Sequence, residues 1–286
     1  MKVSDIFVEG KTVLSFEVFP PKATSPIESV YKPLEQLCAL NPAFISVTYG
    51  AAGGAKSHCC EIASRIKHVH GIEPVAHLTC VGNTTPEIQA VLDDFKANGI
   101  ENILALRGDI VPGQPVCHDF KYASDLTSFI KSRNPEFDVC GACYPEVHME
   151  SNSELEDILN LKKKVDAGAS HLISQLFFDN QIYYNFLQKV RIAGINVPIS
   201  AGIMPVVNKK QIERMVSLCG ASLPPKFVKV MQKYGDNPEA MRDAGIAYAI
   251  NQIVDLISNG VEGIHIYTMN NPYVATAICE GIKNLL

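Results

Sequence analysis

Glu17 is an acidic residue within the apolar segment that runs from Thr12 to Phe19. An ionised carboxylate is costly to bury, so such a glutamate either finds a partner or carries a raised pKa. A raised pKa is what a general acid needs near neutral pH. Pro20 and Pro21 follow the segment and cannot donate to a strand ladder, so Glu17 should lie near the carboxyl end of a strand. Barrel enzymes hold their active sites at such ends.

Length and charge narrow the class of protein. The chain has 286 residues and no break in composition, which favours one domain over residues 1–286. A net charge of -5 without any block of Lys or Arg argues against nucleic acid or an anionic membrane surface as the main partner. No segment approaches the ~20 apolar residues of a membrane span, and the first residues lack the apolar core of a signal peptide. We therefore expect a small-molecule substrate and a cytoplasmic location.

The cysteines are expected to be reduced thiols. There are nine, an odd number, and a domain of this size needs no disulfide staples. Cys140 and Cys143 have the spacing of a redox or metal motif, but they fall inside a strand pattern and have no second pair. Cys59 and Cys60 lie early in an expected helix, where a vicinal pair offers poor metal geometry. A structural role is favoured for both pairs.

Short apolar segments rich in Val and Ile alternate with amphipathic segments of about ten to eighteen residues, which indicates repeated βα units. The expected strands are Thr12 to Phe19, Ala43 to Thr48, Glu73 to Cys80, Asn102 to Arg107, Phe137 to Tyr144, His171 to Phe178, Val197 to Met204 and Gly263 to Met269. The expected helices are Ile27 to Leu40, His58 to His70, Pro86 to Asn98, Tyr122 to Ser132, Ser153 to Ala167, Gln181 to Ala193, Asn208 to Cys219 and Pro272 to Leu285, with two extra helices, Pro224 to Tyr234 and Pro238 to Ser258, before the last strand.

Eight such units in a chain of this length predict an α/β fold, a (β/α)8 TIM barrel with a closed parallel sheet. A doubly wound open sheet is the competing fold. It normally has fewer strands and carries phosphate-binding glycines after its first strand. Here Pro20, Pro21 and Lys22 occupy that place, so the barrel is favoured.

A barrel would bring polar groups at the strand ends together although they are distant in the sequence. These groups are Glu17, Thr48, Tyr49, His77, Thr79, Arg107, Gly108, Asp109, Tyr144, Glu146, His148, Gln175, Met204, Tyr267, Thr268 and Asn270. No lysine is among them, which disfavours Schiff-base chemistry. His77, His148, Glu17 and Asp109 could gather around a metal ion, but no compact ligand set is present, so no metal site is predicted.

The motifs at these ends resemble the methylenetetrahydrofolate reductase family over the whole chain and in collinear order. The matching segments are Ser15 to Pro21, Val47 to Ala51, His77 to Cys80, Leu106 to Asp109, Tyr144 to His148, Leu161 to Ala169, Gln175 to Asp179 and His265 to Thr268.

The resemblance implies an FAD-dependent oxidoreductase that reduces 5,10-methylenetetrahydrofolate to 5-methyltetrahydrofolate in one-carbon metabolism, which feeds methionine biosynthesis. In this family NADH or NADPH usually gives a hydride to FAD, leaves, and is replaced by the folate. Glu17 would be the general acid that protonates the nitrogen of the methylene bridge. Asp109 would place a negative charge near the flavin and the folate; its plainer interpretation is a turn or helix-cap residue.

The residues that the family pattern assigns to the cofactor come from several strand ends and one helix. They are Thr48, Tyr49, Ala51, His77, Arg107, Gly108, Asp109, Tyr122, Ala142, Tyr144, His148, Asp157, Asn160, Lys163 and Lys164. Positions 157, 160 and 164 share one helical face and could hold the ribose and pyrophosphate. Taken alone, that pattern is typical of an ordinary solvated face.

The residues assigned to the substrate are Gln175, Gln211, Met215, Tyr267 and Asn271. Met215 stands where relatives often have an aromatic residue, and Asn271 stands where an arginine can contact the substrate. A methionine can still pack against a ring, but asparagine offers no bidentate cation for a carboxylate.

Two other hypotheses remain open. The same barrel could take electrons from a partner protein, such as a ferredoxin or a flavin or iron-sulfur subunit, or it could be a non-catalytic subunit. The presence of Glu17, Asp109 and Gln175 together argues against the second. The resemblance covers the catalytic barrel only, so we expect no regulatory domain, and relatives suggest a homo-oligomer.

Overall fold

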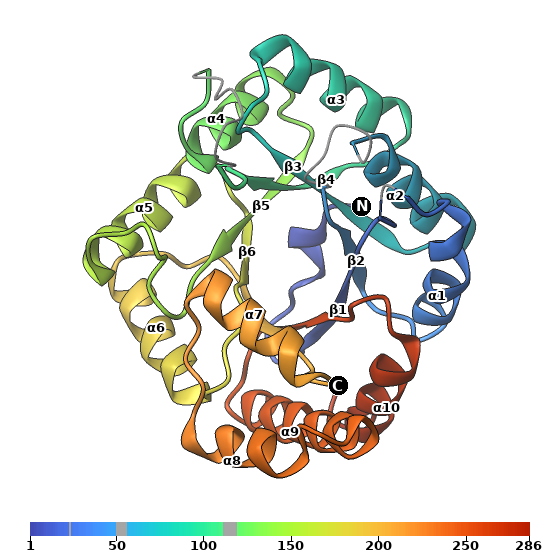
Figure 1. Ribbon diagram of the computed structural model, residues 1–286. Helices are drawn as coiled ribbons and strands as arrows, with labels where there is room; N and C mark the ends of the chain where they lie inside the picture. Colours follow the sequence, from blue (N-terminus) through green and yellow to red (C-terminus); the bar gives the residue numbers. More distant parts are fainter. Residues whose placement is uncertain (23, 50–55, 111–118) are drawn as a thin grey trace.

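Eight parallel strands close into a barrel around which the helices are arranged (Figure 1). The computed structural model describes residues 1–22, 24–49, 56–110 and 119–286. The strands are β1 (Val13–Val18), β2 (Phe44–Val47), β3 (Glu73–Thr79), β4 (Asn102–Leu106), β5 (Asp138–Cys143), β6 (His171–Ser174), β7 (Ile199–Ile203) and β8 (Gly263–Tyr267). Each strand pairs with the next along the chain, and β8 pairs with β1.

The helices follow the strands as a barrel requires. They are α1 (Glu28–Cys38), α2 (Lys56–His70), α3 (Thr85–Ala97), α4 (Ala123–Arg133), α5 (Glu154–Asp166), α6 (Asn180–Ile192), α7 (Lys209–Cys219), α8 (Pro225–Tyr234), α9 (Pro238–Ser258) and α10 (Pro272–Ile282). The predicted barrel, its eight strands and both extra helices are confirmed. Proline at the first turn of α3, α8, α9 and α10 marks where these helices begin, because its missing N–H is not needed there.

The largest difference from the expected strands is at β6, which ends at Ser174 and not at Phe178. Beyond Ser174, Leu176 and Phe178 have left the sheet and pack in a second core under α7 and α8, whereas Phe177 packs in the main core. Phe178, for example, stacks on Phe227 of α8 with ring centroids 5.3 Å apart. The buried apolar segment therefore continues past the end of β6, and hydrophobicity alone does not show where the strand ends.

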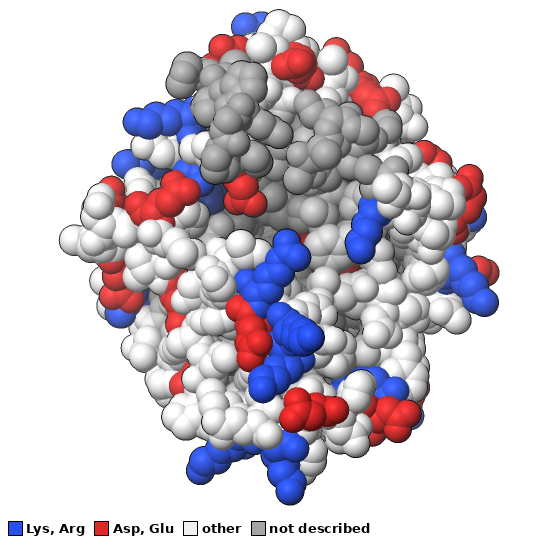
Figure 2. Space-filling view, viewed as in Figure 1, with Lys and Arg blue, Asp and Glu red and all other residues white. Residues whose placement is uncertain are grey.

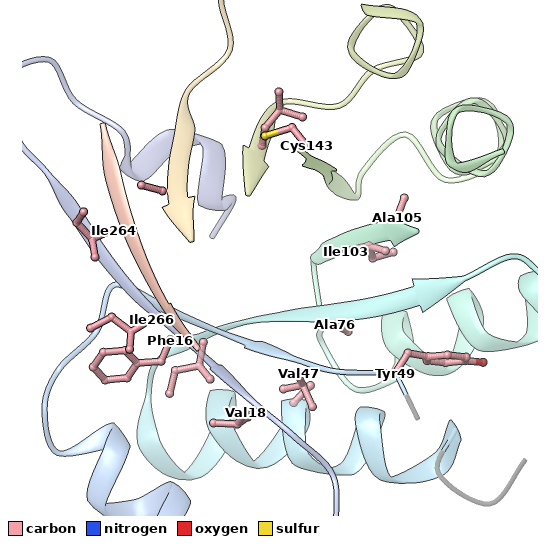
Figure 3. Close-up of a cluster of buried hydrophobic side chains, with 14 of the residues drawn as sticks. Phe16, Val18, Val47, Tyr49, Ala76, Ile103, Ala105, Cys143, Ile264 and Ile266 are labelled. Carbon is pink, nitrogen blue, oxygen red and sulfur yellow. The ribbon is translucent and has the colours of Figure 1, made fainter. Parts of the chain in front are cut away.

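Alternation along β1 decides which side of the barrel wall each side chain reaches. Phe16 and Val18 lie in the layer between strands and helices, where Ile266 of β8 lies next to Phe16 (Figure 3). Because successive side chains of a strand point to opposite faces, Ser15 and Glu17 point into the barrel. One face of β1 thus packs in the core between the strands and the helices, and its other face carries Glu17 into the barrel.

The bottom of the barrel is closed by a short 3-10 helix, η1 (Val3–Ile6), that the sequence pattern did not predict. Val3 is fully buried, and its N–H donates to Oδ1 of Asn102 at 2.8 Å. The N–H of Ser4 donates to Asp138 Oδ2 at 2.8 Å. Phe7 then packs against the ring of His171 inside the barrel. Among the described helices, none is long and apolar enough to cross a membrane.

Candidate active site

Glu17 lies at the carboxyl end of β1 among polar groups from β2, β3 and β8. The hydroxyl groups of Ser46 and Thr48 donate to its two carboxylate oxygens, each at 3.4 Å. Nε2 of His77 is 3.5 Å from Oε2, and Nε2 of His265 is 3.8 Å from the same atom. Only 8% of Glu17 is exposed, so these neighbours, and not solvent, set its protonation.

The structure corrects the expectation that Glu17 has a raised pKa. Burial raises the pKa of this carboxyl, but the contact with His265 and the charges of His77 and His265 lower it more, so the pKa lies below its ordinary value. Burial also lowers the pKa of His77 to about 4. His77 is therefore neutral near pH 7, and the contact with His265 remains the main cause that favours the ionised acid.

His265 is held by hydroxyl groups on both ring nitrogens. Its Nδ1 lies 2.7 Å from Ser15 Oγ, and its Nε2 lies 3.3 Å from Ser46 Oγ. Ser46 thus touches both His265 and Glu17. The sequence analysis did not select His265 or Ser46 as site residues, although both stand at inward positions of their strands, level with Ser15 and Glu17 in the register.

The end of β4 carries Arg107, Gly108 and Asp109. Gly108 has φ +86°, and a Cβ there would lie 2.7 Å from Val81 Cγ1, so glycine is required. Arg107 makes a bidentate ion pair with Glu150, at 2.5 and 2.7 Å. Asp109 is exposed and does not cap α4, which begins only at Ala123. Its carboxylate adds to burial in raising the pKa of Tyr144 to about 12, which places its charge near that ring.

A cavity of about 400 Å³ opens beside β4 and β5 and reaches α4 and α5. Its lining includes the unpredicted Glu150 and nine of the residues assigned to the cofactor, which are Arg107, Tyr122, Ala142, Tyr144, His148, Asp157, Asn160, Lys163 and Lys164.

The polar lining of this cavity is ordered by the loop after β5. Asp157 accepts the N–H of His148 at 3.2 Å and the hydroxyl of Ser151 at 3.3 Å. The ring of His148 packs edge-on against Tyr144, with centroids 4.6 Å apart. Tyr144 and His148 therefore form one aromatic wall, and Asp157 fixes its backbone.

The face of α5 that carries positions 157, 160 and 164 is not wholly exposed to solvent. Lys163 lies exposed and donates to Asn160 Oδ1 at 3.0 Å. Lys164 instead packs its stem over Gly141, and its ammonium donates to the carbonyl of Ala142. Burial lowers the pKa of Lys164. This lysine is thus half-buried at the wall of the cavity, not on an open surface.

The remaining cofactor assignments come from β2 and α4. Tyr49 is buried, and its hydroxyl has no hydrogen-bond partner within the described part of the chain. Burial raises its pKa to about 12. Tyr122 is half-exposed, immediately before α4. Ala51 lies outside the described residues.

Gln175 and Tyr267 lie at neighbouring places of the barrel mouth. The side-chain carbonyl of Gln175 accepts the N–H of Leu176 at 2.9 Å, which leaves its amide NH2 group as the donor. The hydroxyl of Tyr267 donates to the carbonyl of Ser174 at 2.7 Å. Tyr267 of β8 reaches past β7 to Ser174 of β6 because position 202 in β7 is glycine, where a Cβ would lie 2.9 Å from the ring.

The other substrate assignments lie on α7 and before α10. Gln211 and Met215 line a small hollow together with Met204, which follows β7. Asn271 is the N-cap of α10, and its side-chain oxygen accepts the N–H of Val274 at 3.3 Å. The structure therefore gives Asn271 a helix-capping contact, whereas Gln211 and Met215 face a hollow.

The cysteine pairs have structural places. Cys140 and Cys143 are buried in β5, and burial raises the pKa of the Cys143 thiol to about 12. Cys59 and Cys60 are buried in α2. All cysteines of the described ranges are free, and no group of three or more His, Cys, Asp or Glu side chains there is arranged to hold a metal ion.

A closed barrel whose strand ends gather a buried acid, an amide donor and a cavity lined by charged and aromatic side chains belongs to the (β/α)8 enzymes, which place their chemistry at this end. The methylenetetrahydrofolate reductase family model matches residues 2–283, and the chain belongs to this family. The chain is therefore an oxidoreductase, and the family supports a folate as the molecule reduced.

Similar proteins agree with this assignment. The 5,10-methylenetetrahydrofolate reductase of Escherichia coli is 38% identical over 273 residues, which cover 96% of this chain and 91% of that protein. Methylenetetrahydrofolate reductase (NADH) 1 of Arabidopsis thaliana is 36% identical over 94% of this chain and 48% of its own. An uncharacterized protein from Clostridium thermocellum, described as binding two copies of 5-methyl-5,6,7,8-tetrahydrofolic acid, has a TM-score of 0.68 at 15% identity and covers 99% of this chain and 97% of its own. That last likeness shows the fold alone.

Proposed function

We propose that this chain reduces 5,10-methylenetetrahydrofolate to 5-methyltetrahydrofolate, with FAD as its bound cofactor and a reduced nicotinamide as the electron donor. The observation that carries the proposal is Glu17. It is a buried carboxyl at the barrel mouth, in contact with Thr48, Ser46 and two histidines. Opening the five-membered ring of this substrate needs a proton at one nitrogen of the methylene bridge, and a buried acid can supply it.

The cavity beside β4 and β5 suits FAD by the chemistry of its lining. Arg107, Lys163 and Lys164 are cations of the kind that bind a pyrophosphate, and Asp157 and Asn160 can accept from or donate to ribose hydroxyl groups. The unpaired hydroxyl of Tyr49 is a further polar group without a partner in the described chain. Bound FAD would supply hydride transfer, which no side chain performs.

Glu17 would hold the proton and pass it to the bridge nitrogen. In the structure the contact with His265 favours the ionised carboxylate. A pterin bound at the barrel mouth would cover the small part of Glu17 that is still exposed, and loss of that remaining water would favour the neutral acid. The hydroxyl groups of Ser46 and Thr48 would hold the carboxyl group of Glu17 in place in both its ionised and its neutral form.

Asp109 and Gln175 would act on the substrate without giving up a proton. Ring opening creates a cationic iminium, and the carboxylate of Asp109 at the end of β4 would stabilise that charge. The free NH2 group of Gln175 can donate to a carbonyl oxygen or ring nitrogen of the pterin. Both groups orient the substrate and favour the charged state, whereas Glu17 alone moves a proton.

The electron donor is part of the proposal. We favour NADH, because the name of the Arabidopsis relative includes it. The test is anaerobic mixing of the FAD-loaded protein with NADH, with NADPH, or with neither, while flavin absorbance is followed. We expect NADH to bleach the flavin and methylenetetrahydrofolate to restore its colour. A colourless protein that takes up no FAD would overturn the proposal, and a flavin that neither nicotinamide reduces would overturn the donor.

A further inference from the structure

His265 of β8 is fully buried beside Glu17 inside the barrel. Its ring stacks on Phe44 of β2 with centroids 5.9 Å apart, and it meets the ring of Tyr267 edge-on at 5.5 Å. These two contacts hold the plane of the imidazole ring. The Nε2 atom of His265 is therefore kept on the side of Glu17, and its Nδ1 atom is kept on the side of Ser15.

The hydroxyl group of Ser15 suits both protonation states of this ring. Ser15 Oγ lies 2.7 Å from His265 Nδ1 and 3.2 Å from the carbonyl oxygen of Ile264. When the ring is neutral, the hydroxyl can donate to Nδ1. When the ring is protonated, the hydroxyl can donate to Ile264 instead, and its oxygen then accepts the N–H of Nδ1. Rotation of one hydroxyl thus satisfies His265 with or without a second proton.

Ser46 connects the other ring nitrogen to the carboxyl group of Glu17. The direct distance from His265 Nε2 to Glu17 Oε2 is 3.8 Å, which is too long for a hydrogen bond. Ser46 Oγ bridges the two atoms, at 3.3 Å from Nε2 and 3.4 Å from Oε2. A hydroxyl can accept one proton while it donates its own, so Ser46 can pass a proton from the ring to the carboxylate. Long contacts of this kind often tighten when a substrate binds.

The other titratable groups that face His265 each keep one charge state near pH 7. His77 of β3 and His171 of β6 are buried, and burial lowers the pKa of each to about 4. The hydroxyl of Tyr267 donates to a carbonyl oxygen, and burial raises its pKa well above the ordinary value. Among these groups, Glu17 and His265 are therefore the pair that can exchange a proton at neutral pH.

We propose that His265 is a positioning residue that stores the proton which Glu17 delivers to the substrate. This inference rests on the proposed function. In the open site the proton is on Nε2 of His265, and Glu17 is ionised. When the substrate covers Glu17, the Nε2–H bond breaks and its electron pair stays on the ring, Ser46 passes one proton on, and an O–H bond forms on Glu17. Both groups are then neutral, which suits a site closed to water.

The stored proton is replaced from the barrel mouth. Figure 2 shows this face of the molecule hollowed at its centre, beside α7. Of the two groups only Glu17 has any exposed surface, since His265 is fully buried. After the product leaves, water at the mouth gives one proton to Glu17, and Ser46 passes a proton back to His265. The pair thus gains one proton and loses one in each turnover.

Sharing one proton between two groups extends the pH range in which Glu17 can act. Two acceptors in contact bind a shared proton at least as firmly as either group binds it alone. Glu17 without His265 would lose its proton at a lower pH. Loss of His265 should therefore move the alkaline limit of folate reduction to lower pH and leave the reduction of the flavin, which needs no acid, unchanged.

The test is single-turnover reduction of methylenetetrahydrofolate by the protein with reduced FAD, followed by flavin absorbance from about pH 6 to about pH 9. His265→Gln keeps an N–H near Ser46 but cannot release a proton. We expect its alkaline limit to lie about one pH unit or more lower, so that the rate at about pH 8 falls about ten-fold and recovers in part at about pH 6. His68→Gln makes the same change at an exposed position of α2 and should keep the unmodified profile.

Ser15→Ala is the second variant and leaves the ring in place. It removes the oxygen that accepts the Nδ1–H of the protonated ring, so its alkaline limit should move in the same direction. If His265→Gln does not fold, as judged by circular dichroism and flavin content, Ser15→Ala decides alone.

Equal slowing at every pH, or an unchanged alkaline limit in the folded variants, would overturn the role of His265 as a proton store. Such a result leaves the proposed function standing, because the unmodified protein still reduces the folate. Failure of the unmodified FAD-loaded protein to reduce the folate at any pH would overturn both proposals.

Discussion

Glu17 and Asp109 are two carboxylates at one barrel mouth with opposite environments. Glu17 is buried beside His265, whereas Asp109 is exposed after Gly108 at the end of β4. The protonation of a buried carboxylate responds to whatever covers it. In the proposed reaction Glu17 would transfer the proton, and Asp109 would face the cationic substrate.

Replacement of Glu17 by glutamine tests this division. Glu17→Gln keeps the size of the side chain but removes the transferable proton. We expect reduction of the folate to fall by at least about 100-fold, as for loss of a general acid, while reduction of the flavin by NADH changes little. Single-turnover absorbance measurements of each half-reaction provide the comparison.

The control for Glu17→Gln is Glu28→Gln, the same chemical change at an exposed position of α1, which should leave both half-reactions intact. Equal slowing of the two half-reactions in Glu17→Gln would contradict the assignment of Glu17 as the acid.

At the scale of elements, η1 ties the amino terminus to the bottom of the barrel through Asn102. This buried side chain accepts the N–H of Val3 and donates to the carbonyl of Met1 at 3.1 Å. Asn102→Ala leaves both backbone groups without these partners. We expect it to lower the free energy of unfolding by about 1–3 kcal/mol, measured by urea denaturation, with FAD binding at the opposite end unchanged.

Asn185→Ala serves as the comparison for Asn102→Ala, because Asn185 is exposed on α6. Its effect should stay within about 0.5 kcal/mol. If Asn102→Ala proves no more harmful than Asn185→Ala, η1 does not contribute to the stability of the barrel.

The sequence predicted those elements whose signals are local. Alternating apolar segments located β1 to β8, and prolines located the starts of α8 and α10. The 3-10 helix η1 was not predicted because its contacts are with residues distant in the sequence: Val3 contacts Asn102, 99 positions away, and Phe7 contacts His171. The contact of His265 with Ser15 and Glu17 was not predicted for the same reason, because it depends on the pairing of β1 with β8.

Some residues of the candidate site could likewise be predicted from the sequence, and others could not. Motif resemblance selected Glu17, Arg107 and Asp157 by their positions in strand and helix ends, and the structure places Arg107 and Asp157 on one cavity. It could not select Glu150, whose ion pair with Arg107 forms only in three dimensions. Nor could it give the direction of the pKa of Glu17, because the apolar residues around Glu17 in the sequence do not show that His77 of β3 and His265 of β8 lie beside it in the barrel.

At the scale of the whole molecule, the interior of the barrel contains buried histidines that are held neutral. Burial lowers the pKa of His171 to about 4, as it does for His77. The ring of His171 is enclosed by Phe7 and Phe44, and neither of its nitrogens has a hydrogen-bond partner in the described chain. Protonation of such a ring is costly in the folded barrel and easy in the unfolded chain.

This difference predicts a loss of stability in mild acid. An unfolded histidine takes up its proton near its ordinary pKa of about 6.5, whereas His171 in the barrel does so only near pH 4. The unfolded chain therefore binds more protons as the pH falls through that window, and stability falls with it, by about 2 kcal/mol per buried histidine between pH 7 and pH 5. Urea denaturation at several pH values measures the slope.

His171→Leu removes the titrating ring and should flatten that slope, even though the lost packing lowers stability at every pH. The difference between two pH values is the informative quantity, because a constant packing loss cancels in it. His68→Leu is the control, since His68 is exposed on α2 and should leave the slope unchanged. Parallel curves for the unmodified protein and His171→Leu would show that His171 is protonated in the folded barrel as readily as in the unfolded chain.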